Sequence, residues 1–418
     1  MNLYVQSLFF AIPIFISLIL IEMVFAKYKG IKINNSEDMI SSLSSGMSNT
    51  IKDAIKFSFV IISYTWLVDN LTLIKIESLW LSVLIAFIVQ DFAGYWSHRL
   101  SHRVNFLWNR HLIHHSSEEF NLSCALRQSI SDTVKFFTFL WIPAAVFGIP
   151  AKIFAIIAPI HLFLQFWYHT RLIGKMGILE YFIVTPSHHR VHHAINPEYI
   201  DKNYGQIFII WDKIFGTFQK ELDHIKPVYG ILRPTSTWNP VIINFKHIIQ
   251  LTKDCWNTTL FKDKIKIWFM PTGWRPKDVI KKYPLLETND PFKQDKYRVH
   301  NSINVIFWGW FQLIITGFLM FHLFIIIPDL DAIMYYLYSL FLLMNIFSFT
   351  SILDNKKYAV LVDLFKLLTV SFILLIQDFS WYGLDILYSS LFFIYIILST
   401  FISFYFSDQF DKLKNIKV

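Results

Sequence analysis

The stretch HRLSHRVNFLWNRHLIHH at residues 98–115 decides the fold, together with HHRVHH at residues 188–193. Both stretches lie at the edge of a long apolar run, where a membrane span would end. Their histidines form three groups with the spacings H-x3-H, H-x2-H-H and H-x2-H-H, which comprise His98 and His102; His111, His114 and His115; and His189, His192 and His193. Neutral imidazole binds first-row transition metals, and these eight groups exceed what one tetrahedral zinc ion can use. The pattern therefore predicts two metal ions in a membrane-embedded di-iron site for oxygen chemistry.

Zinc is the alternative metal. It would need only three or four of these histidines and would leave the others unexplained. Soluble di-iron bundles use Glu and Glu-x-x-His ligands, and the sequence shows no such arrangement. All-nitrogen ligation by iron is therefore the favoured interpretation.

The first histidine group is expected at the end of one continuous helix, from Trp80 to His102. His98 and His102 are one turn apart on this helix, so both imidazoles point from the same face. Asp91 falls on the same stripe seven residues earlier. Its carboxylate could accept the second ring N–H of a ligand histidine, or it could be a polar residue that packs between helices.

The histidines outside the three boxes are not equally good candidates for metal ligands. His169 follows an apolar run close to the expected interface and is a candidate ninth ligand. His161 lies deeper and is expected to be packed or to line a cavity, and His188 abuts the third group but breaks its spacing. Surface or interfacial positions are expected for the others, which are His224, His247, His300 and His322.

The composition predicts an all-α, polytopic integral membrane protein. Of 418 residues, 54% are hydrophobic and 42 are Phe, which excludes an ordinary soluble domain. The two cysteines, Cys124 and Cys255, exclude a disulfide framework and a four-thiolate zinc site. Hydropathy predicts about nine spans. They cover residues 3–25, 55–73, 80–96, 134–147, 153–168, 303–327, 332–353, 358–376 and 384–406.

Charge sets the expected orientation. Lysines such as Lys27, Lys29 and Lys32 crowd the first loop, whereas the opposite turns carry mainly acids. Positive-inside logic then places the N-terminus outside and all three histidine groups in the cytoplasm. Residues 171–300 are rich in Lys and Arg and are expected to form a cytoplasmic helical cap against the lipid headgroups. Nothing in the sequence resembles a nucleic-acid module.

Two parts are expected along the chain. Residues 1–300 would form the membrane-embedded catalytic domain with its cap, and residues 301–418 a C-terminal bundle of transmembrane helices. The bundle carries no chemical motif, so it is expected to brace the catalytic part or to enclose substrate.

The three histidine boxes resemble those of the fatty acid hydroxylase/sterol desaturase superfamily. Longer strings around them are similar to the alkylglycerol monooxygenase family within it. These strings are HHSSEEFNLSCALRQS at 114–129, TPSHHRVHH at 185–193 and IDKNYGQIFIIWDKIFGTF at 200–218. The similarity continues more weakly into the C-terminal helices.

This resemblance implies an iron-dependent membrane monooxygenase that uses O2 and tetrahydrobiopterin to hydroxylate the ether-linked carbon of alkylglycerols. The hemiacetal product would fall apart to a fatty aldehyde and a glycerol derivative. The eight boxed histidines would be the ligands of two non-haem iron ions. Arg103 and Arg171 depart from the family pattern, because animal enzymes of this kind carry an acid at each place. Glu118 and Glu119, just after the second box, are candidates for binding a polar cofactor or are solvated loop acids.

Two other functions remain open from the sequence. The same iron site would serve a hydroxylase or desaturase of another lipid, such as a sterol, a fatty acyl chain or a carotenoid. No fused cytochrome b5, flavin or ferredoxin domain is recognisable, so electrons would come from a diffusible cofactor or a separate donor protein. A metal transporter or non-catalytic metal-binding protein is less favoured, since transporters place their ligands at the bilayer midplane on broken helices.

Overall fold

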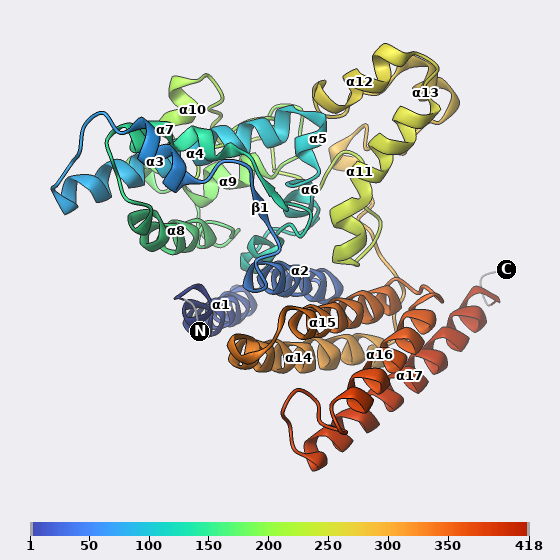
Figure 1. Cartoon of the computed structure of the whole chain (residues 1–418). Coiled ribbons are helices and arrows are strands. Elements are labelled where there is room, and N and C mark those ends of the chain that lie inside the picture. The colour runs from blue at the N-terminus through green and yellow to red at the C-terminus, as the bar shows by residue number, and fades with distance from the viewer. Residues whose placement is uncertain (1–2, 416–418) are drawn as a thin grey trace.

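The chain is almost entirely helical in its computed structural model, which describes residues 3–415 and the side chains of residues 5–409 (Figure 1). The only strands among these residues are β1 (Phe59–Val60) and β2 (Val134–Lys135), which pair in parallel. The prediction of an all-α membrane fold is confirmed.

The helices that carry the histidines of the three boxes all precede residue 300. α4 (Leu79–Arg103) is one continuous helix, as predicted for residues 80–102, and it begins at the N-cap Ser78. The helices before and after it are α1 (Leu3–Tyr28), α2 (Ser36–Ala54), α3 (Tyr64–Leu71), α5 (Asn105–Trp108), α6 (Leu112–His115), η1 (Leu122–Leu126), η2 (Phe137–Trp141), α7 (Ile142–Val146) and α8 (Ala151–Phe166). Residues 171–300 add further helices, namely η3 (Gly177–Tyr181), α9 (Pro186–His192), α10 (Ile210–Ile214), α11 (Pro240–Asn257), α12 (Phe261–Phe269), α13 (Lys277–Lys282) and η4 (Pro291–Lys293).

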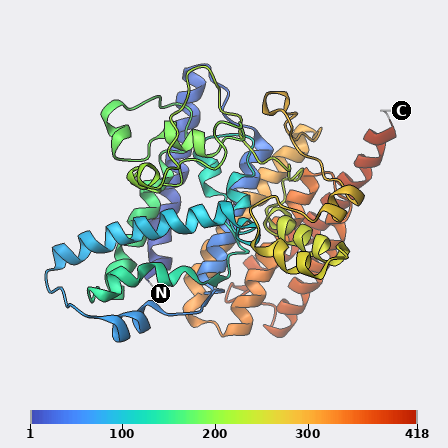
Figure 2. The ribbon, with the colours of Figure 1, turned by 90° about the horizontal axis from the view of Figure 1, so that it is seen from above.

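The C-terminal helices gather on one side of the molecule, as the orange and red ribbons show in both views (Figures 1 and 2). They are α14 (Ile303–Ile326), η5 (Ile327–Asp329), α15 (Ala332–Leu353), α16 (Ala359–Ile376) and α17 (Ile386–Asn415). Lys366 and Asp363 of α16 form a buried ion pair of 2.5 Å there, and the Lys366 ammonium also donates to Asn345 of α15 at 2.8 Å. α14 and α15 both pack against α2, so these helices adjoin the histidine-bearing part. The division of the chain at residue 300 stays a prediction.

Six helices of the described part are long and apolar enough to cross a membrane. They are Val5–Tyr28, Leu79–Arg103, Ile303–Asp329, Ala332–Leu353, Ala359–Ile376 and Ile386–Gln409. The prediction of about nine spans is therefore wrong in number. Residues 55–73 are divided between β1 and α3, and the apolar helices Phe137–Val146 and Ala151–Phe166 are shorter than the about 20 residues that a span needs. Hydropathy located these runs but could not show that the backbone breaks within the first two or that the third helix is short.

Gly309 lies where α14 meets α2 and α15. A Cβ atom at this position would be 3.1 Å from Ile40 Cδ1 and 3.3 Å from Leu353 Cδ2. We expect Gly309→Val to lower the free energy of unfolding by about 1–3 kcal/mol, because the added methyl groups would overpack a fully buried contact. Thermal unfolding in detergent measures the effect. Gly317→Val on the same helix is the matched control, since its Cβ would meet only the flexible Met47 side chain at 3.4 Å. Equal melting temperatures for the two variants would contradict the close contact at Gly309.

Candidate metal centre

Nine imidazoles converge in the structure and are here called the histidine cage. They comprise all eight histidines of the three boxes and His169, the candidate ninth ligand. One group holds five of them, His98, His102, His111, His115 and His192; the other holds four, His114, His169, His189 and His193. Within each group, the nitrogen atoms that could bind a metal lie within 4.8 Å of one another.

Four separate pieces of the chain supply the cage. The end of α4 carries the first box, and α6 with the residue before it carries the second. His169 follows the end of α8, and α9 carries most of the third box. Pro186 at the start of α9 favours a helix beginning there, because its fixed φ suits the first turn.

Backbone carbonyls of one loop fix two rings of the five-membered group. His98 donates from Nδ1 to the Tyr204 carbonyl at 2.8 Å, and His192 donates from Nδ1 to the Lys202 carbonyl at 2.9 Å. A carbonyl only accepts, so Nδ1 carries the proton and Nε2 keeps a free lone pair in each neutral ring. Both Nε2 atoms are buried and have no hydrogen-bond partner among the described residues.

Two rings of the four-membered group are fixed in the same way. His114 Nδ1 donates to the Arg127 carbonyl at 3.3 Å, and His169 Nδ1 donates to the Gln165 carbonyl at 3.0 Å. The Nε2 atoms of these two rings are 3.3 Å apart, so two lone pairs face each other with no proton between them. This contact is unfavourable unless a cation lies beside it.

The spacing of the nitrogen atoms fits transition-metal ligation. Neighbouring Nε2 atoms are 3.1 Å apart between His102 and His115, 3.1 Å between His193 and His114, and 2.8 Å between His189 and His169. Two ligands about 2.0–2.1 Å from one ion and at right angles to each other would be about 3 Å apart. Inward lone pairs at this spacing are a donor set suited to divalent first-row metals.

Burial keeps the cage neutral. It lowers the pKa of His114 to about 4 and, for the other members outside α4, lowers the pKa well below its ordinary value. Neutral imidazole is the form that binds metal, so no proton has to be removed at neutral pH.

Asp91 does not orient a ring of the cage. Its carboxylate accepts hydrogen bonds from the backbone N–H of Ile207 at 2.8 Å and of Phe208 at 3.1 Å, and from the Trp211 indole at 2.9 Å. His161 is the fourth hydrogen-bond partner of this carboxylate, with its Nε2 atom 3.0 Å from Asp91 Oδ1. Asp91 therefore holds the segment that follows Tyr204. Of the two roles open to it from the sequence, a polar contact between packed segments is the one observed, because the ring it contacts is His161 and not a member of the cage.

Asp212 supports the same loop from the other side, a role that the sequence did not reveal. It accepts from the backbone N–H of Tyr204 at 2.8 Å and of Gly205 at 2.7 Å. The Tyr204 carbonyl, which orients His98, is thus held by a fully buried carboxylate. The sequence feature that could have indicated this role is the position of Asp212 within a largely apolar stretch, directly after Trp211.

A large cavity of about 1260 Å³ opens beside the cage. Members of both groups line it, including His98, His111 and His169, and so does His161 as expected. Its wall is largely apolar, and α1, α2, α8 and α14 supply much of it. A chamber of this kind can accommodate an alkyl chain next to the candidate metals.

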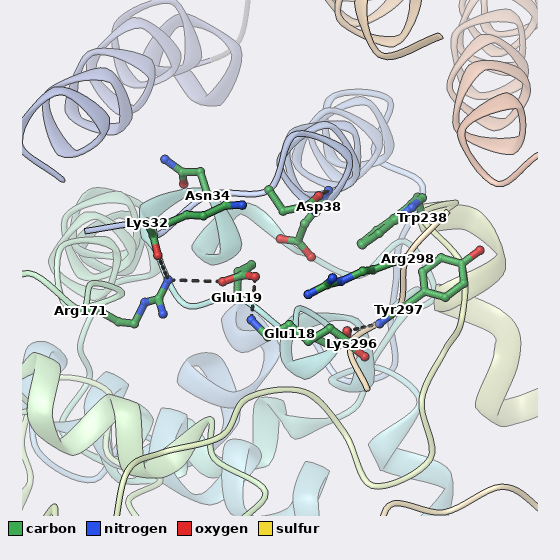
Figure 3. A pocket seen from close by; sticks show the side chains of 11 residues that line it. Lys32, Asn34, Asp38, Glu118, Glu119, Arg171, Trp238, Lys296, Tyr297 and Arg298 are labelled. Carbon is green, nitrogen blue, oxygen red and sulfur yellow. Dashed lines mark hydrogen bonds and ion pairs between the residues drawn. The ribbon is translucent and has the colours of Figure 1, made fainter. Parts of the chain in front are cut away.

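Glu118 and Glu119 lie in a second cavity, here called the polar pocket, of about 460 Å³ (Figure 3). Glu118 accepts from the Tyr297 backbone N–H at 2.6 Å, and Glu119 pairs with Lys296 at 2.7 Å and with Arg171 at 3.3 Å. They are therefore bonded wall residues and not solvated loop acids. The next residue is Phe120, whose ring centroid lies 5.3 Å from that of His193, so the pocket adjoins the cage.

Arg103, the other departure from the family pattern, pairs with Asp201 at 2.7 Å. Its side chain is half exposed and lines neither cavity. Asp201 directly precedes Lys202, whose carbonyl holds His192. This ion pair thus lies on the outer side of the loop that orients the cage.

Comparisons with known proteins agree with this geometry. Residues 83–217, which contain the whole cage, match the sequence model of the fatty acid hydroxylase family. The chain is 40% identical to alkylglycerol monooxygenase of Homo sapiens over 64% of its own length and 59% of the relative, and 39% identical to that of Danio rerio over the same shares. It is 30% identical to the ornithine lipid hydroxylase OlsE of Rhizobium tropici over 37% of its length and 44% of the relative.

The chain thus spans less than two thirds of the length of these relatives. No solved structure matches it. The segment that carries the histidine cage has the sequence pattern of the fatty acid hydroxylase family, and nearly two thirds of the chain is similar to alkylglycerol monooxygenases.

Proposed function

We propose that this chain is a multi-pass membrane monooxygenase that hydroxylates the ether-linked carbon of alkylglycerol lipids. One oxygen atom of O2 enters the C–H bond, and the other leaves as water with two electrons and two protons from a reductant. The hemiacetal product then collapses to a fatty aldehyde and a glycerol derivative. The observation that carries the proposal is the convergence of nine imidazoles, five of which line a largely apolar cavity.

Each group of the cage would hold one non-haem iron ion. The five-membered group and the four-membered group account for all nine histidines, whereas one zinc ion would use four at most. Bound iron would supply the oxygen-activating redox chemistry that side chains lack. The role of these histidines as ligands, and their place on the cytoplasmic side, remain predictions.

The chain itself would bind and orient the lipid. The apolar walls of the large cavity would take the alkyl chain and exclude water from the reacting carbon. An ether-linked carbon lies where tail and headgroup meet. The cage is next to both apolar and polar lining residues of the same cavity, so a lipid bound there could present this carbon to it.

Tetrahydrobiopterin is the proposed reductant, and the polar pocket is its proposed place. The carboxylates of Glu118 and Glu119 could accept N–H groups of a planar heterocycle, while Trp238 and Tyr297, with ring centroids 5.0 Å apart, offer flat apolar surface. Phe120, which follows Glu119 in the chain, contacts the cage through the ring of His193. A separate electron-donor protein is the alternative source.

The test is the release of fatty aldehyde from an alkylglycerol by iron-loaded protein in detergent under air. We expect aldehyde that requires iron, O2 and tetrahydrobiopterin. Aldehyde formed only with a reducing protein would replace the pterin by a separate donor. No aldehyde from protein of verified iron content would contradict the ether-lipid assignment and favour a sterol, a fatty acyl chain or a carotenoid as substrate. Stoichiometric zinc together with inactivity after iron reconstitution would contradict oxygenation itself.

A further inference from the structure

One part of the large cavity is polar, in contrast to the walls from α1 and α14. This polar recess is formed by residues far apart in the sequence, at the end of α2 and in the segments that flank the second histidine box and β2. The residues that matter here are Lys52, Asp53, Arg110, Ser129, Asp132 and Lys135, and all of them line the cavity.

Arg110 is the one member of the recess with an unused buried donor. Its Nη2 donates to Asp132 at 3.0 Å, and its guanidinium lies 5.1 Å from the ring centroid of Phe137. Its Nη1 is buried and has no hydrogen-bond partner among the described residues. A buried guanidinium N–H without an acceptor is costly, so the geometry calls for an oxygen atom from a ligand.

The charges of the recess favour an anion. Three cationic side chains, Lys52, Arg110 and Lys135, face two carboxylates, Asp53 and Asp132. The carboxylates are already engaged: Asp132 accepts from Arg110 and from Lys135 at 2.6 Å, and Asp53 pairs with Lys52 at 3.2 Å. One positive charge is left over, and Lys52 is itself held in place by the Ser129 carbonyl at 3.1 Å.

The recess adjoins the cage. Arg110 directly precedes His111, and both side chains line the same cavity. Arg110, through Asp132, is also joined to the segment whose Arg127 carbonyl orients His114. A ligand group held by Arg110 would thus lie close to the candidate metals, while an attached alkyl chain could follow the apolar wall.

We propose that the recess binds the phosphate of a lipid headgroup through Arg110, which makes a phosphate-bearing ether lipid the preferred occupant of the cavity. A guanidinium matches phosphate oxygens in geometry as well as in charge. This inference rests on the proposed function, because it takes the same cavity as the substrate site. It adds the headgroup chemistry and the residue that selects it.

The test measures lipid binding and needs neither iron nor turnover. The full chain in nanodiscs of zwitterionic lipid is titrated with hexadecylglycerol phosphate and with uncharged hexadecylglycerol, by competition against a radiolabelled alkyl lipid. We expect the phosphate lipid to bind about tenfold more tightly. Arg110→Gln should weaken it by about tenfold or more and change the uncharged lipid by less than about twofold. Arg110→Lys should restore part of the preference, since it keeps the charge but not the planar donor.

Arg233→Gln is the matched control, because this arginine pairs with Glu287 on the surface and lines neither cavity. Equal affinity of the parent protein for the two lipids, or an Arg110→Gln variant that loses both equally, would overturn the proposal. Displacement of the phosphate lipid by inorganic phosphate at similar concentration would assign the recess to the free ion and overturn it too. A preserved binding preference without aldehyde formation would contradict the proposed function alone, whereas aldehyde formation without a preference would contradict only the headgroup assignment.

Discussion

His192→Ala is expected to lower the iron content of the purified protein and to reduce aldehyde formation by about 100-fold or more. The His192 Nε2 atom is buried without a partner, and its Nδ1 proton is fixed by the Lys202 carbonyl, so the ring is set to present a lone pair inward. Removing an outer partner of a ligand already costs about 10–100-fold in metal affinity or activity, and removing a ligand costs at least the upper end of that range. Iron per chain, by mass spectrometry of the element, and turnover are measured together.

His188→Ala is the matched control. His188 is buried in the same helix α9, but its ring packs on Phe218 and belongs to neither group of the cage. It should keep the iron content and most of the turnover. Parent-like iron and turnover in His192→Ala would refute its role as a ligand. Equal iron loss in both variants would instead show that α9 had been disrupted as a whole.

The sequence predicted which histidines meet, because their spacing follows the helical repeat. Residues four apart share a face of a helix, and the pairs His98/His102, His111/His115 and His189/His193 each fall within one group. The sequence could not predict how the histidines of each box are distributed between the two groups of the cage. The adjacent His114 and His115 belong to different groups, since neighbouring residues of a helix point about 100° apart and only the tertiary structure places partners beside each of them.

Other features could not be predicted from the sequence because they depend on contacts between distant segments. The polar pocket joins residues near Lys32, Glu118, Arg171 and Tyr297, which no local pattern connects. The three additional spans were predicted wrongly for a related reason. Apolar composition shows that a run is buried or faces lipid, but not where its helix begins and ends or whether it is long enough to cross a membrane. His169 was predictable in part. Its position after an apolar helix made it a candidate ligand, but the histidines that it meets lie on other segments.

Asp91→Ala is expected to lower the free energy of unfolding by about 3 kcal/mol or more. The fully buried carboxylate accepts from two backbone N–H groups, the Trp211 indole and His161, and alanine would leave these donors without an acceptor. Each unsatisfied buried donor costs about 1–3 kcal/mol. The iron content should fall as well, because Asp91 holds the segment that directly follows Tyr204, whose carbonyl orients His98. Denaturant unfolding in detergent and iron analysis test the two effects separately.

A comparison with Asp254 separates general destabilisation from an effect on the cage. Asp254 is equally buried but pairs with Arg275 at 2.6 Å, in a part of the chain that lines neither cavity. Asp254→Ala should destabilise the protein to a similar degree, because it leaves a buried guanidinium unpaired, and yet keep the iron content of the folded fraction. If both variants retain iron, the loop does not need Asp91 to present His98 and His192. If only Asp91→Ala loses it, a carboxylate that touches no ring of the cage positions two of its members through the backbone of one loop.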